Sequence, residues 1–329
     1  MSAKPCQSEF RQRGVAAITA ILVVALASML AVELAWEMNL DIRRTENMLL
    51  RDQARQIALG AEFMAADELR KDFEDDAENG EFRDDLTERW NTDLTFPVDG
   101  GTVRGKLSGM QSRFNLNNLI FGGKKNPETF DQFVRLLTVL ELDREIAPKV
   151  LDWIDPNQIA ELGGAEDGVY TAKSPPYLTA NTWFTTTTEL LAIDGFVDPA
   201  EPDSRMFKFL ERYVAALPSG TKINVNTAED PVLLSFAEGA GAANAEVLRA
   251  NRPYSQLLVS DSATGSAFMD DAEGLVTPEF ADAHLQVFTE YFQLKVAVTL
   301  GTAQLTMYSL MHRDPQGLVT TRLRYFDTK

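Results

Sequence analysis

The sequence predicts an α+β fold in which a long N-terminal helix packs on an antiparallel sheet, with a large α-helical domain inserted between the early and late strands. The first observation is the stretch from Val15 to Leu59, which holds no Gly and no Pro and can therefore form one helix of about 65 Å. The second is the alternation of apolar and polar residues near the C-terminus, and the third is the helix-rich pattern between these two regions.

The first part of this helix is apolar enough to cross a membrane. Val15–Val32 contains no charged residue, and as a helix it spans about 27 Å, close to the roughly 30 Å hydrocarbon core of a bilayer. Trp36 suits the membrane surface, and Lys4, Arg11 and Arg13 place the N-terminus in the cytoplasm by the positive-inside rule. A cleaved secretory signal peptide and a buried helix of a soluble domain are the alternatives.

Beyond Trp36 the helix becomes amphipathic. Apolar residues recur at near-helical spacing between charged positions, and the helical pattern continues to about Asn79-Gly80. These apolar residues are Met38, Ile42, Leu49, Ile57, Ala61 and Met64. An apolar half that runs without a break into an amphipathic half predicts a membrane-anchored rod carrying an extracytoplasmic head.

Strand patterns lie on both sides of the helical block. Residues 102–110 read as one strand, and alternating segments at 292–301, 303–313 and 318–326 predict a three-stranded antiparallel meander. Residues 127–220 read as mostly helical, with two apolar faces that we expect in a core rather than in a binding groove. The two faces comprise Phe133, Leu136, Leu137, Leu140 and Leu142, and then Ile146, Val150, Leu151 and Ile154.

Composition excludes several classes of function. With 31 Lys and Arg against 49 Asp and Glu, the formal net charge of −18 disfavours nucleic acid as a partner. The single cysteine, Cys6, rules out an intramolecular disulfide, and two histidines far apart in the sequence offer little for a zinc site. The sequence has no nucleophile motif and no phosphate-binding loop, so we expect that the protein is not an enzyme.

The segment from Arg13 to Thr19 (RGVAAIT) resembles a type III prepilin leader followed by the start of a mature pilin, the signature of the type IV pilin superfamily. The resemblance implies that a prepilin peptidase cleaves between Gly14 and Val15 and methylates the new N-terminus. Most members carry Glu at the fifth mature position, where this chain has Thr19. Lacking that Glu is typical of the K-type subunit of type II secretion systems, which has no subunit ahead of it. An incidental Thr in a simple hydrophobic anchor is the alternative.

Further segments resemble the K-type minor pseudopilins over nearly the whole chain. They include Arg113–Leu119 (RFNLNNL), Asp152–Asp155 (DWID) with Gly164–Asp167 (GAED), and Ser174–Tyr177. The resemblance implies a single-pass inner-membrane protein with a periplasmic C-terminal domain. It implies that this protein forms the pseudopilus tip with the I- and J-type minor pseudopilins and supports pseudopilus assembly and protein export. Other pseudopilins, the secretin and secreted substrates are the further partners implied.

On this basis the chain divides into five parts with a pilin-like core. The parts are a prepilin leader (1–14), the transmembrane half of the N-terminal helix (15–36), a first part of the pilin core (37–120), an inserted α-helical domain (121–283), and the C-terminal antiparallel strands of the pilin core (284–329).

Oxygen-bearing side chains gather in the loop after Ile154. Asp155, Asn157, Glu166 and Asp167 could supply ligands to Ca²⁺, which takes about six to eight oxygens, although their spacing is not that of an EF-hand. From the residues alone, helix caps or water-facing acids explain the pattern equally well. The helical domain of K-type pseudopilins binds calcium, so the resemblance favours a calcium site.

A second short motif suggests an alternative function. Lys222–Ala228 (KINVNTA) resembles the opening of helix-hairpin-helix DNA-binding domains, with Gly239-Ala240-Gly241 as the hairpin. The protein would then be a membrane-anchored DNA receptor. However, Glu229, Asp230 and Glu238 flank the motif, and their charge is wrong for a phosphate backbone. We therefore expect a fold element here and no nucleic acid.

Overall fold

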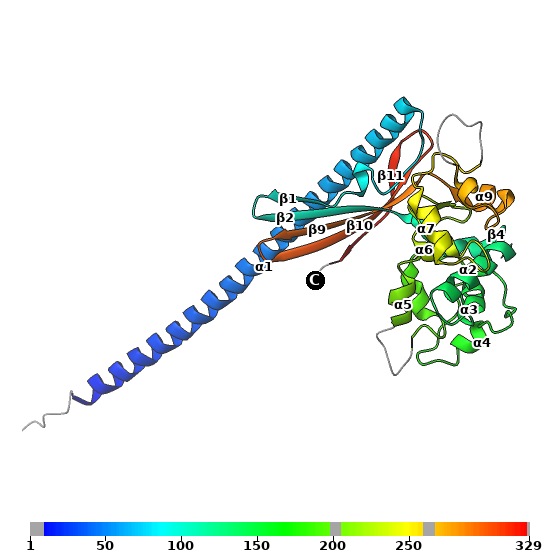
Figure 1. Cartoon of the computed structure of the whole chain (residues 1–329). Coiled ribbons are helices and arrows are strands. Elements are labelled where there is room, and N and C mark those ends of the chain that lie inside the picture. Colours follow the sequence, from blue (N-terminus) through cyan, green and yellow to red (C-terminus); the bar gives the residue numbers. More distant parts are fainter. Residues whose placement is uncertain (1–9, 198–204, 259–266, 328–329) are drawn as a thin grey trace, which may run out of the picture.

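A computed structural model describes residues 10–197, 205–258 and 267–327. Positions 1–9 of the predicted leader lie outside these residues. Helix α1, Phe10–Asn79, is one unbroken helix of 70 residues, which confirms the long helix that the sequence predicts. Figure 1 shows its N-terminal half projecting away from the rest of the molecule, whereas its C-terminal half lies along the sheet. The chain leaves the helix at Gly80, whose φ of 71° suits a residue without a Cβ atom.

The two halves of α1 have different surroundings. The projecting half contains a window of 18 residues with a mean hydropathy of 2.7, none of it buried within the molecule, and is long and apolar enough to cross a membrane. In the other half, Ala54, Ala58, Ala65 and Leu69 are buried at helical spacing. Because three of these four side chains are single methyl groups, the sheet can approach the helix closely.

Five antiparallel strands form the sheet on α1, in the order β1-β2-β9-β10-β11. Their bounds are β1 Leu94–Val98, β2 Gly101–Gly109, β9 Tyr291–Leu300, β10 Ala303–Arg313 and β11 Val319–Asp327. The last three confirm the predicted meander. β1 is not among the predicted strands, since Pro97 breaks its pattern, but an edge strand tolerates a proline. β2 pairs with β9 although the inserted domain separates them in sequence.

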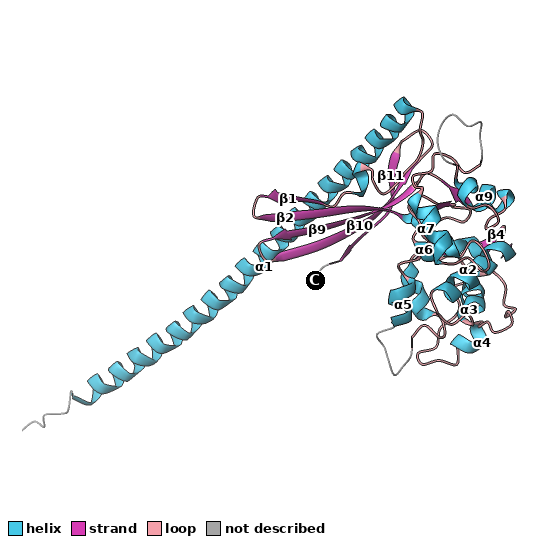
Figure 2. Ribbon diagram, in the orientation of Figure 1, coloured by secondary structure: helices cyan, strands magenta, loops and turns pink. Residues whose placement is uncertain are grey.

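The inserted domain combines short helices, paired two-residue strands and long loops (Figure 2). Its helices are α2 Pro127–Val139, α3 Ile146–Ile154, α4 Asp167–Tyr170, α5 Arg205–Leu210, α6 Asp230–Leu234, α7 Ala242–Ala250, α8 Phe268–Asp271 and α9 Pro278–His284. Its strand pairs are β3 Phe114–Asn115 with β6 Val214–Ala215, β4 Ile120–Phe121 with β5 Lys124–Lys125, and β7 Ile223–Asn224 with β8 Leu285–Gln286.

The segment 127–220 is less helical than predicted. Its two apolar faces are buried in one core, as expected, but irregular loops occupy much of the stretch between α3 and α5. Proline, glycine and threonine are frequent in these loops, and their backbone is held by side chains rather than by helical hydrogen bonds.

Core packing also moves the expected limits of the inserted domain at 121 and 283. Phe114, Leu116 and Leu119 belong to the core of this domain, and so do Leu285 and Val287 at the other end. The core of the helix–sheet unit is separate and includes Leu107 and Phe292. The domain therefore begins and ends where β2 and β9 meet, a few residues outside the expected limits on both sides.

Buried asparagines explain two of the sequence motifs. Asn117 of the RFNLNNL segment donates to the carbonyls of Phe184 and Leu217, at 3.0 and 2.9 Å, and accepts from the Phe184 N–H at 2.8 Å. Asn226 of the KINVNTA segment donates to the carbonyl of Tyr254 at 2.9 Å and accepts from its N–H at 2.8 Å. Both motifs therefore brace loops of the inserted domain through side-chain amides.

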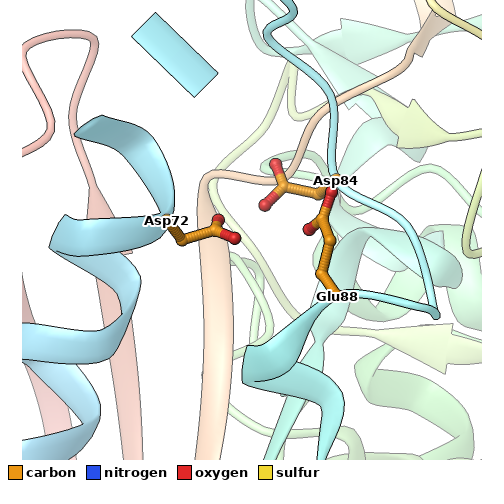
Figure 3. Close-up of side chains that lie close together, drawn as sticks. All are labelled: Asp72, Asp84 and Glu88. Carbon is orange, nitrogen blue, oxygen red and sulfur yellow. The ribbon is translucent and has the colours of Figure 1, made fainter. Parts of the chain in front are cut away.

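Arg313, at the end of β10, joins the sheet to α1. Its guanidinium donates to both carboxylate oxygens of Asp84, at 2.7 and 2.6 Å, and to Asp72 of α1 at 2.8 Å. Arg313 and Asp84 are buried, being 5% and 0% exposed. Figure 3 shows the carboxylates of Asp72, Asp84 and Glu88 turned toward one another from α1 and from the segment that follows it.

Asp84 ties the inserted domain to the same place. Its backbone carbonyl accepts from the Asn224 amide at 2.9 Å, and its N–H donates to the carbonyl of Val287 at 3.0 Å. Its carboxylate accepts from the N–H of Thr289 at 2.6 Å. Helix α1, the sheet and the inserted domain thus meet at one residue. We call the group of Asp72, Asp84, Glu88 and Arg313 the junction.

The junction holds more carboxylates than cations. Burial, followed by the charges of Asp72 and Asp84, raises the pKa of Glu88 to about 8. Burial and the charge of Asp84 raise the pKa of Asp76, nearby on α1, to about 6. In the folded protein these side chains therefore keep a proton at a pH where an unfolded chain has already lost it.

We predict that the free energy of unfolding falls as the pH rises from about 5 to 8. A carboxyl group whose pKa is raised on folding stabilises the protein fully below its unfolded pKa, about 4.3 for Glu, and this contribution is lost as the pH rises through the folded pKa. Glu88→Gln cannot ionise, and its amide oxygen can still accept from the Trp90 indole N–H. It should flatten this slope in urea unfolding of the full chain in detergent micelles.

The matched control is Glu246→Gln on α7, where the side chain is exposed. Its slope should equal that of the unmodified protein. Equal slopes for both variants would contradict a role of Glu88 in the pH dependence.

Candidate cation site

Two acidic side chains from α3 meet a third across a loop. The apolar face of α3 is buried in the inserted domain, and it carries Asp152 into the interior, where this residue is 0% exposed. Asp155 directly follows α3, and Glu166 directly precedes α4. Side-chain oxygens of Asp152, Asp155 and Glu166 lie within 4.8 Å of one another. We call these three residues the carboxylate cluster.

Glu166 has a buried carboxylate that nothing satisfies. The residue is 8% exposed, and within the described part of the chain neither Oε1 nor Oε2 has a hydrogen-bond partner. Burial, and then the charges of Asp152, Asp155 and Asp167, raise its pKa to about 7. An unpaired buried carboxylate is unfavourable, so a positive ion here would satisfy oxygens that the protein itself leaves unpaired.

The other two carboxylates are held by the backbone of the loop that follows them. Both oxygens of Asp152 accept from the N–H of Glu161, at 3.1 and 3.2 Å. Asp155 accepts from the backbone N–H and the side-chain amide of Asn157, at 3.1 and 2.8 Å. Burial raises the pKa of both aspartates, and these hydrogen bonds oppose the shift.

The structure brings together two of the four ligands expected from the sequence, Asp155 and Glu166. Asn157 lies beside them but binds Asp155 through its amide, and its own oxygen accepts from Ile159. Asp167 is turned away and accepts from the N–H and hydroxyl of Thr179, both at 2.8 Å. Sequence reasoning missed Asp152, although its place one helical turn before Asp155 puts the two acids on one face.

The cluster fits a divalent cation. It offers three carboxylates and one unpaired pair of oxygens, and hard cations such as Ca²⁺ prefer oxygen ligands. Nearby lysines pair with other acids: Lys125 with Glu161 at 2.9 Å, and Lys149 with Asp194 at 2.8 Å. The acids of the junction differ in this respect, because Arg313 already supplies a positive charge there.

The residues of the predicted processing site lie at the start of α1. Gly14 and Val15 are helical, and Val15 is exposed. The hydroxyl of Thr19 donates to the carbonyl of Val15 at 3.1 Å and that of Ala16 at 3.0 Å. Thr19 is therefore satisfied by its own helix.

The KINVNTA motif leads into a pair of helices, α6 and α7, joined by the Gly239–Gly241 turn. Arg249, the basic residue nearest the end of α7, pairs with Asp230 at 2.8 Å. Its charge is thus matched within the domain rather than directed at a phosphate.

Comparison with known proteins gives three consistent results. The family profile for type II secretion system (T2SS), protein K, matches residues 112–219. The type II secretion system protein K of Pseudomonas aeruginosa is 33% identical over 324 residues, covering 95% of this chain and 92% of the relative. The protein of the same name from Pectobacterium carotovorum is 32% identical over 336 residues, covering 96% of this chain and 97% of the relative.

The fold is also known. A chain in the crystal structure of the GspK–GspI–GspJ complex from the type 2 secretion system of enterotoxigenic Escherichia coli superposes with a TM-score of 0.67. The two are 24% identical, and the match covers 87% of this chain and 99% of the other.

Proposed function

The chain belongs to the family of type II secretion system protein K, the K-type minor pseudopilins, and from this premise we propose that it forms the tip of the pseudopilus. There it joins the I- and J-type minor pseudopilins and supports pseudopilus assembly and protein export. The observation that carries the proposal is the place of the inserted domain, at the end of α1 farthest from the apolar segment (Figure 1). A domain in this position obstructs the addition of a further subunit ahead.

Two further observations support the tip position. The hydroxyl of Thr19 is satisfied within α1, so this helix needs no amine from a neighbouring subunit in the membrane. The solved structure with the same fold was determined as a GspK–GspI–GspJ complex, which supports I- and J-type partners for this chain. The role is structural, and the secretin and secreted substrates are partners that the exposed inserted domain can meet.

The proposal includes processing and orientation. A prepilin peptidase cleaves between Gly14 and Val15 and methylates the new N-terminus, and basic residues before the span hold that end in the cytoplasm. The head then lies in the periplasm, anchored in the inner membrane by α1. The alternative of a DNA receptor is less well supported, because Arg249 is paired and the surroundings of the α6–α7 turn are acidic.

We further propose that the carboxylate cluster binds calcium, through Asp152, Asp155 and Glu166. The cation would offset two of the three buried negative charges and connect α3 to the start of α4. Its role is to hold the loop between them in one conformation.

The tip position predicts a loss of assembly for one substitution at Thr19 and no change for another. Thr19→Glu places a carboxylate in the membrane with no partner ahead, at a penalty of up to about 2.5–3.5 kcal/mol. It should reduce the amount of this chain that co-purifies with full-length I- and J-type subunits from membranes. Thr19→Val, of similar size, should behave as the unmodified protein. Improved co-purification of Thr19→Glu would indicate a shaft subunit instead.

Processing has a direct test. After co-expression with a prepilin peptidase, mass spectrometry of the membrane fraction should find a chain that begins at a methylated Val15. Replacing Gly14 by Val adds a bulky branched side chain next to the cleaved bond, which a narrow peptidase site cannot accept, and should leave the N-terminus uncut. A chain cut after Val32 would mean a secretory signal instead.

Calcium should raise the thermal unfolding temperature of the full chain in micelles, because a ligand that binds only the folded state stabilises it. Glu166→Gln should remove most of this increase, since it neutralises the carboxylate with unpaired oxygens. The matched control is Glu189→Gln, on the loop helix Thr187–Ala192 of the same domain. An equal calcium effect in both variants would argue against this site.

A further inference from the structure

The loop between α3 and α4 is wrapped tightly around Asp152. The N–H of Glu161 reaches both oxygens of its carboxylate, and the backbone of Ala165 also hydrogen-bonds to it. Between these two contacts, Gly164 passes directly over the carboxylate. A Cβ atom added at Gly164 would overlap Oδ2 of Asp152, and would lie 2.7 Å from its Cγ and 3.1 Å from its Oδ1.

Such an overlap has to move something at the site. Real Cβ atoms essentially never come within 3.0 Å of a heavy atom. The Asp152 side chain is short, 0% exposed and hydrogen-bonded on both oxygens, so its carboxylate cannot turn away without breaking those bonds. The other response is that the loop withdraws from α3. In that case Glu166, two residues after Gly164, moves away from Asp152 and Asp155.

We propose that Gly164 is a positioning residue of the cation site: its missing side chain lets the loop close on Asp152, and this closure holds the unpaired carboxylate of Glu166 in place before the cation arrives. The inference rests on the proposed calcium function. It goes beyond that function because Gly164 contributes no ligand atom and acts only on the geometry of the site.

The neighbouring glycines show that only position 164 requires a missing side chain for steric reasons at the carboxylate cluster. Gly168, four residues on, has nothing within 4 Å of an added Cβ, and its φ is not in the left-handed region. Gly163 has a φ of +83°, so a substitution there is strained for a different reason. Gly168→Ala is therefore the matched control for Gly164→Ala, because it adds the same methyl group four residues on, in α4, where nothing overlaps it.

The experiment titrates terbium, and then calcium, into the full chain in detergent micelles. Terbium is a luminescent substitute for calcium, and Trp153, beside Asp152 on α3, can sensitise it. Gly164→Ala should weaken binding by about 10–100-fold, the range typical for changes to groups that orient metal ligands. Gly168→Ala should bind as the unmodified protein does. Equal affinities for the two variants would overturn the positioning role while leaving the cation site intact.

If the unmodified protein binds neither ion, both the cation site and the inference fail, whereas equal affinities of the two variants refute the inference alone. A second measurement covers poor folding of Gly164→Ala. Without metal, this substitution should lower the unfolding temperature less in an Asp152→Ala background than in the unmodified protein, because the overlapping carboxylate is gone. Equal decreases in both backgrounds would show that the overlap is not the cause and would overturn the inference.

Discussion

The structure depends on the pairing of Arg313 with Asp72 and Asp84. A pilin-like core needs α1 and the sheet to stay together. The large domain inserted between β2 and β9 is joined to the sheet by only two chain segments, which alone would let it rotate relative to the sheet. Arg313 and Asp84 stop this by combining a buried ion pair, in which one guanidinium nitrogen donates to both carboxylate oxygens, with hydrogen bonds from Asp84 to Val287, Thr289 and the Asn224 side chain. Breaking a buried pair of this kind costs about 3–5 kcal/mol, because the remaining charge is left unpaired.

The same junction explains why the insertion is tolerated. Gly101 pairs with Leu300 and Gly109 with Phe292, so the full length of β2 is matched to β9 and the sheet is complete without the inserted residues. The insertion leaves the sheet at one end only, next to Asp84. It therefore adds a domain at the distal end of α1 without disturbing the face that α1 covers. The proposed tip position needs this division between a helix–sheet stem and a separate distal domain.

The sequence alone predicted the elements in which apolar residues recur at a regular spacing. The uninterrupted run from Val15 and the alternation from Phe292 to Phe326 predicted α1 and the meander, since each period leaves only one arrangement that buries the apolar residues. It was insufficient where tertiary contacts decide. Strand β1 has a proline, and the loops between α3 and α5 are held by single side chains such as Asn117 and Asp167. The limits of the inserted domain shifted because Phe114 packs with α2 rather than with α1.

The carboxylate cluster also depends on tertiary contacts that the sequence pattern does not reveal. Sequence reasoning found the acidic segment but selected ligands by their position in a loop, and so it included Asp167, which binds Thr179, and omitted Asp152, which is on a helix. Which oxygens converge depends on how the loop folds back on α3, and that depends on Gly164, a residue that composition would class as a spacer. In such a site the set of ligands depends on the residues between them as much as on the ligands themselves. Glu166 can reach Asp152 and Asp155 only if the backbone at Gly164 can pass over the Asp152 carboxylate.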